Sequence, residues 1–212
     1  MDSVPNVFIE RVTGILCEKT VRVLREGQVI LGRWAFAHPT YKELKLTIAT
    51  FNGKKFCSFY LKEEDLRNVT LANVFSMWNM ATCNFIAVKF YATPVVLGEP
   101  LKENHFRTLK KMIAQQRRRI SLLYIGPCEE ELLDNAVDIL ELCGGVEQLR
   151  IDTNMTRIAP VVNKLISDGG VCEFMLFDRI FPDHMIIPTL TTQIEFGNLR
   201  AVYRVGPKFG IT

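Results

Sequence analysis

The chain has 212 residues, of which 26 are basic and 23 are acidic, so its formal net charge is +3. With 48% hydrophobic and 23% charged residues, it has too many apolar side chains for long disorder, and its net charge is too small to indicate nucleic-acid binding. A chain of this length can bury a core without disulfides or a structural metal, so we expect one globular domain or two small ones.

The first residues and the cysteines indicate the compartment. Met1–Pro5 carries an acid where a signal peptide needs basic residues, so secretion is not expected. The longest uncharged run, 68–88, contains four asparagines, two threonines and one serine, which is typical of buried globular structure and not of a membrane span. The six cysteines stand at least 15 positions apart and form no CxxC motif. We therefore expect reduced thiols, no metal site and a location in the cytoplasm or the nucleus.

Residues 1–40 have the pattern of a small helical module. Ser3 can cap a first helix, and Pro5 suits its first turn. Apolar residues then recur at three- and four-residue steps and predict one apolar face: Val4, Phe8, Val12, Ile15 and Leu16. A second short helix is expected to begin at Thr20 and to end at Gly27.

Residues 41–100 predict a β-hairpin and a strand-rich connector. Apolar and polar residues alternate from Leu44 to Ile48, and the pair Asn52–Gly53 separates them from a second apolar run. Asn-Gly supplies the two positive φ angles of a type I′ turn, so it predicts a hairpin. Another strand is expected over 85–91, whereas the pattern of 71–80 leaves helix and strand open.

Residues 101–212 alternate between helical and strand-like segments. This order predicts an α/β fold with a parallel sheet, because parallel neighbours need a crossover between them. Helices are predicted at 102–116, 129–143, 158–167 and 185–193. Strands are predicted at 120–125, 146–151, 171–177 and 199–205.

An apolar-x-apolar pattern recurs in these four strands. Its pairs follow one another at steps of 26, 25 and 29 residues: Leu123/Ile125, Leu149/Ile151, Phe174/Leu176 and Tyr203/Val205. Such spacing is typical of leucine-rich repeats, so we expect a leucine-rich-repeat-like βα array. Because the alternate positions are partly polar, we expect one open sheet face, either solvated or binding a protein substrate. The residues predicted to bind there are Tyr124, Arg150, Met175 and Arg204.

No catalytic motif emerges. The sequence contains no G-x-S-x-G, Walker A, G-x-G-x-x-G or HExxH pattern. Cys128 is the best candidate nucleophile because it precedes a predicted helix, but Glu129, Glu130 and Glu131 oppose a thiolate and favour a structural thiol. A basic cluster at 107–119 lies near a helix end without interleaved aromatic residues, so nucleic acid is not favoured. We predict no enzyme activity and no cofactor.

The N-terminal module resembles the F-box. The resemblance rests on the opening pair Val4–Pro5, the spaced apolar residues of two helices and the downstream Trp34. With the hairpin around Phe51–Gly53 and the C-terminal repeat, the chain is similar to expanded F-box-like proteins of nematode type. The resemblance implies a substrate receptor of an SCF-type cullin-RING ubiquitin ligase, which binds a SKP-type linker. The residues that it implies at the linker are Pro5, Phe8, Val12, Leu16, Leu24 and Trp34.

Two alternatives to the receptor role stay open. The six N-terminal residues can simply form the core of their own module. The chain can also be a repeat-type protein-binding module with a degenerate F-box and no role in a ligase.

Overall fold

The computed structural model describes most of the chain from residue 42 onward. The described residues are 42–62, 68–79, 83–96, 98–116, 118–153, 156–177 and 183–204, with Val4, Pro5, Phe8, Ile9, Val12 and Val23. The strands are β1 (Lys42–Phe51), β2 (Lys54–Leu61), β3 (Asn68–Val69), β4 (Cys83–Ala92), β5 (Glu99–Pro100), β6 (Ile120–Ile125), β7 (Val146–Ile151), β8 (Val171–Leu176) and β9 (Ala201–Arg204). The helices are α5 (Leu71–Met77), α6 (Glu103–Gln115), α7 (Glu130–Leu142), α8 (Ala159–Ser167) and α9 (Asp183–Glu195).

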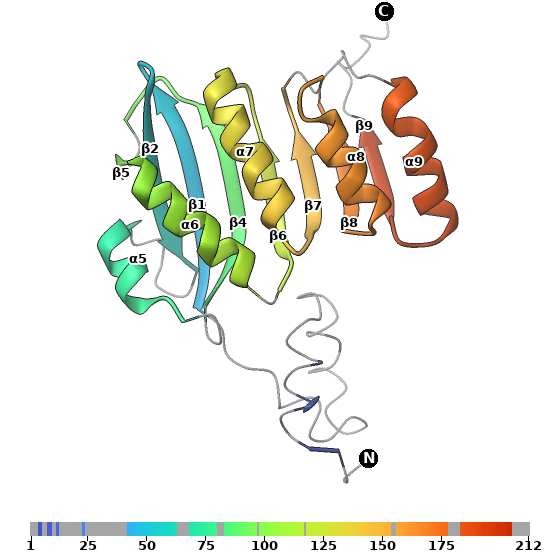
Figure 1. Ribbon diagram of the computed structural model, residues 1–212, viewed down its shortest axis with the longest axis horizontal. Coiled ribbons are helices and arrows are strands. Elements are labelled where there is room, and N and C mark those ends of the chain that lie inside the picture. The colour runs from blue at the N-terminus through green and yellow to red at the C-terminus, as the bar shows by residue number, and fades with distance from the viewer. Residues whose placement is uncertain are drawn as a thin grey trace, which may run out of the picture.

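These strands form one mostly parallel sheet, which confirms the α/β class (Figure 1). Its order is β3-β2-β1-β4-β6-β7-β8-β9, and β5 pairs with the outer side of β2. The neighbours from β1 through β4 to β9 run parallel, whereas β2 runs antiparallel to β1. β4 belongs to the predicted connector 41–100, and β6 belongs to the predicted repeat region 101–212. Because β4 pairs directly with β6, one continuous sheet includes both regions.

The predicted hairpin is confirmed. Residues from Leu44 to Phe51 on β1 pair in register with residues from Lys54 to Leu61 on β2. Asn52 has a φ of 49° and Gly53 a φ of 69°, which are the two positive angles that a type I′ turn needs. The Asn-Gly turn therefore fixes the register in which β1 and β2 pair.

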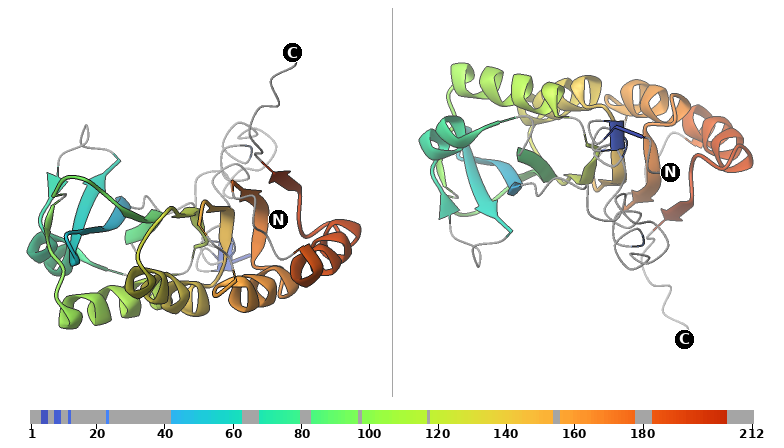
Figure 2. Two further views of the ribbon diagram at one scale, coloured as in Figure 1. Left: turned by 90° about the horizontal axis from the view of Figure 1, so that it is seen from above. Right: turned by 90° about the horizontal axis from the view of Figure 1, so that it is seen from below.

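Helices and strands alternate from α6 onward as the sequence predicts. In the two end-on views, α6, α7, α8 and α9 lie along one face of the sheet (Figure 2). We call the opposite face of the strands the open face. Each strand sends alternate side chains to the two faces, so one set packs under the helices and the other forms the open face.

The core lies between the sheet and these helices. Leu123, Leu149 and Phe174, from three neighbouring strands, are at most 1% exposed and pair in register. Ile139 of α7 and Val162 of α8 are fully buried with them in the same cluster. Burying an aliphatic or aromatic side chain of this size contributes about 1.5–3 kcal/mol, so this layer accounts for much of the stability.

The stretch 71–80, left open by its pattern, contains the short helix α5. Thr70 caps it, because its hydroxyl oxygen accepts a hydrogen bond from the backbone N–H of Asn73 at 3.2 Å. Leu71 and Val74 are buried, so tertiary packing selects the helix. The helices expected over 3–16 and 20–27 lie mostly outside the described residues.

Candidate interaction surface

A row of side chains crosses the open face perpendicular to the strands. Lys89 on β4 pairs with Tyr124 on β6, which pairs with Arg150 on β7. Arg150 pairs with Met175 on β8, and Met175 pairs with Tyr203 on β9. The first four side chains are partly exposed, and Tyr203 is 47% exposed. We call these five residues the cross-strand row. It brings together three of the four residues predicted for the substrate surface.

Arg204 does not belong to this row. The register of β9 pairs Arg204 with Leu176, which is buried, and places Tyr203 opposite Met175 instead. The sequence pattern placed Tyr203 with Val205 in an apolar pair, on the opposite face from Arg204. It failed there because β9 pairs only with β8 among the described strands, and both Val202 and Tyr203 are more than a third exposed. At such an edge, hydrophobicity no longer indicates which face a residue occupies.

Polar contacts hold the centre of the open face. The Nε of Arg150 donates a hydrogen bond to Oε1 of Gln148 at 2.9 Å. The Nε2 of Gln148 in turn donates to Oε2 of Glu173 at 3.1 Å. A neutral amide therefore separates the guanidinium from the carboxylate, and these two charges form no direct ion pair.

Tyr124 is positioned by its neighbours on the carboxyl side of the sheet. Its hydroxyl donates to Oδ2 of Asp152 at 3.3 Å. A β-carbon added to Gly126 would lie 2.8 Å from the Tyr124 hydroxyl oxygen, so glycine is needed for the ring to take this position. Burial, followed by the Asp152 carboxylate, raises the pKa of Tyr124 above its usual value, so the phenol remains a neutral donor at pH 7.

Only part of the open face is accessible. At the amino ends of the strands, Ile120, Val146 and Val171 pair in register on this face and are at most 1% exposed. The cross-strand row lies nearer the carboxyl ends, where the side chains are partly exposed. The exposed part of the open face along β6, β7 and β8 is therefore its carboxyl half.

The residues implied at the linker are described only in part. Pro5 is exposed, Phe8 is 53% exposed, and Val12 is partly exposed. Ile9, which the resemblance does not use, is fully buried. Leu16, Leu24 and Trp34 lie outside the described residues. Within the described part of the module, Ile9 and not Phe8 is the interior residue.

The basic cluster at 107–119 is divided between different roles. Lys110 on α6 forms an ion pair with Asp138 on α7, with 2.8 Å between Nζ and Oδ2. Arg119 donates to Sγ of Cys172 at 3.0 Å and to the carbonyl oxygen of Gly169 at 3.2 Å. These two cations therefore stabilise contacts within the fold.

The geometry of Cys128 agrees with a structural thiol. The residue is partly buried directly before Glu129, the N-cap of α7. Burial, and then the Glu129 carboxylate, raises the pKa of Cys128 to about 11. The thiol is therefore protonated at pH 7, which removes the reactive thiolate.

We expect iodoacetamide to alkylate Cys128 at pH 7 at least about tenfold more slowly than it alkylates free cysteine, because only the thiolate reacts. The rate should rise with pH and reach half of its maximum at about pH 11, where the thiol is half ionised. Mass spectrometry of digested protein, with Cys128→Ser as the control, measures modification at this site. A faster reaction than that of free cysteine would restore the nucleophile hypothesis.

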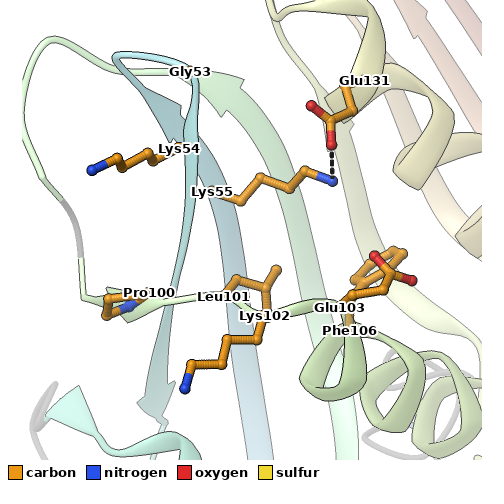
Figure 3. A pocket seen from close by; sticks show the side chains of 9 residues that line it. All are labelled: Gly53, Lys54, Lys55, Pro100, Leu101, Lys102, Glu103, Phe106 and Glu131. Atoms are coloured by element: carbon orange, nitrogen blue, oxygen red, sulfur yellow. Dashed lines mark ion pairs between the residues drawn. The ribbon is translucent and has the colours of Figure 1, made fainter.

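A separate pocket lies on the helix side of the sheet, beside the hairpin turn. It has a volume of about 360 Å³ and is lined by Gly53, Lys54, Lys55, Pro100, Leu101, Lys102, Glu103, Phe106 and Glu131. Lys55 forms an ion pair with Glu131 at 2.7 Å, whereas the side chains of Lys54 and Lys102 point away from this pair (Figure 3). The ion pair links Lys55 on β2 to Glu131 on α7. None of the residues that line the pocket belongs to the cross-strand row.

Among the described residues, no three histidine, cysteine or acidic side chains are grouped so that they could hold a metal ion. The described helices include none that is long and apolar enough to cross a membrane.

Comparisons of the chain with protein-family models, curated proteins and solved structures found no match. The fold and the open face therefore carry the functional argument. Together they define an α/β protein whose mostly parallel sheet is covered by helices on one side. The other side presents aromatic and basic side chains.

Proposed function

We propose that this chain is a non-catalytic protein-interaction adaptor that binds its partner through the open face. The observation that carries the proposal is the cross-strand row, in which tyrosine, arginine and methionine side chains from neighbouring strands lie in register and partly exposed. These side-chain types are enriched in protein interfaces because they combine large apolar area with polar groups.

The proposal includes a leucine-rich-repeat-like arrangement of the C-terminal half. Support comes from three successive units in which a strand is followed by a helix: β6 with α7, β7 with α8 and β8 with α9. All three helices lie on the same side of the sheet (Figure 2). In repeat arrays of this kind, the strand side is commonly the binding side.

We further propose that the adaptor is the substrate receptor of an SCF-type cullin-RING ubiquitin ligase. This role rests on the F-box resemblance of the N-terminal module. It is supported by the exposure of Pro5 and Phe8, because an aromatic side chain that is 53% exposed presents apolar surface to solvent. The alternative, a protein-binding module without a ligase role, differs in making no contact with the SKP-type linker.

Phe8→Asp in the full chain should weaken binding to the SKP-type linker at least about tenfold, because it places a charge in an apolar contact. Val23→Asp is the matched control, since Val23 is an equally exposed apolar residue of the same module, at 57%, outside the implied contact set. Pulldown with purified linker measures both variants. If the unaltered protein does not bind, the receptor role is wrong; if both variants bind normally, Phe8 is not a contact residue.

A further inference from the structure

The open face carries basic side chains that contact no carboxylate in the described part of the chain. The side chains of Lys89 and Lys45 form no hydrogen bond or ion pair with any described residue. The Arg150 side chain donates to the neutral Gln148, and it is Gln148 that donates to Glu173. These cations are therefore available to an acidic ligand.

The cross-strand row has a regular spacing. Lys89 on β4 and Arg150 on β7 are two strands apart, with Tyr124 between them. Arg150 and Tyr203 on β9 are also two strands apart, with Met175 between them. Because neighbouring strands lie about 4.8 Å apart, each of these two steps is roughly 10 Å. Two cations, Lys89 and Arg150, and the aromatic side chain of Tyr203 therefore follow one another at equal intervals along the row.

An extended peptide matches this interval. In the polyproline II conformation, every third side chain returns to the same side of the peptide, about 9 Å further along its axis. Acidic residues three positions apart can therefore reach Lys89 and Arg150, and an apolar residue three positions further can contact Tyr203. The charge of the row and its interval therefore both fit an extended acidic peptide.

We propose that the open face binds an extended acidic segment of a partner protein, in which two carboxylates three residues apart meet Lys89 and Arg150 and an apolar side chain, three residues further, meets Met175 and Tyr203. This inference rests on the proposed adaptor function and names the chemistry of its partner. A protein segment fits better than a nucleic acid because Glu173 and Asp152 lie beside the row. Discrete carboxylates can avoid these acids, whereas a backbone with one phosphate per nucleotide would meet them.

The test uses the full chain and a fluorescein-labelled peptide in a Pro/Ser background, with glutamate at its third and sixth positions and leucine at its ninth. Three further probes are controls. The second peptide has the same composition but adjacent glutamates, and the third has lysine in place of both glutamates. The last probe is single-stranded oligouridine. Fluorescence anisotropy should show binding of the first peptide that is at least about tenfold tighter than that of the other three probes.

Three variants locate the contact. Lys89→Gln removes one cation, and Gln148→Glu places a carboxylate against Arg150 without altering Arg150 itself. Each should weaken binding of the first peptide about tenfold. Lys54→Gln is the matched control, because it removes a cation beside the pocket and should leave binding within about twofold. Circular dichroism confirms that the variants are folded.

The inference is overturned if the first peptide does not bind, or if the peptide with adjacent glutamates or the lysine peptide binds equally well. Equal or tighter binding of oligouridine also overturns it. So does normal binding of the first peptide to both Lys89→Gln and Gln148→Glu. None of these results bears on the ligase role, because binding of the SKP-type linker through Phe8 is measured without the peptide. Failure of the partner chemistry and failure of the receptor role are therefore distinguishable.

Discussion

Gly98→Ala is expected to lower the free energy of unfolding by about 3 kcal/mol or more. Gly98 has a φ of 77°, and a β-carbon there would lie 2.1 Å from the carbonyl oxygen of Cys57. This oxygen belongs to the backbone of β2, so the clash can be relieved only by moving β5 away from β2. The substitution therefore adds a steric conflict to the strain of a left-handed conformation.

Gly53→Ala is the matched control for this prediction. Gly53 also has a positive φ, of 69°, but no atom lies within 4 Å of its added β-carbon. It should lose about 1 kcal/mol, from backbone strain alone. Urea denaturation of the two variants separates the effect of conformation from the effect of close approach. Equal losses would show that β5 does not lie against β2 as described.

The contact of Gly98 illustrates what local pattern cannot predict. A glycine before Pro100 indicates a turn, but its neighbour on β2 is more than 40 residues away in sequence, and only the folded sheet brings them together. In contrast, the hairpin at Asn52–Gly53 is a local property of the chain, since adjacent residues supply both the turn and the alternation. It could therefore be predicted correctly.

The strands β6 and β7 were also predictable to the residue. Charged or glycine residues bound both strands, and their helix-side positions repeat Leu123 and Leu149 at a regular step. Part of the candidate surface followed from this alternation. The place of Lys89 in the row did not follow, because it depends on β4 pairing with β6, and no local pattern states which strands become neighbours.

The interaction proposal depends on the two faces of the sheet having different roles, and neighbouring residues on β4 test this directly. Phe90→Ala should lower the free energy of unfolding by about 3–5 kcal/mol, because the side chain is fully buried and its loss leaves a cavity. Phe90 pairs with Ile48 on one side and with Ile125 on the other, both also fully buried, so the surrounding sheet cannot collapse into the space.

Tyr91→Ala, at the next position of the same strand, should cost only about 1 kcal/mol, because the Tyr91 side chain is partly exposed on the open face. Urea denaturation of both variants measures the difference. If Tyr91→Ala were as destabilising as Phe90→Ala, the open face would be as tightly packed as the core and would have no room for a partner. A large difference instead leaves the open face free to vary for binding while the helix side maintains the fold, which is the separation that an adaptor requires.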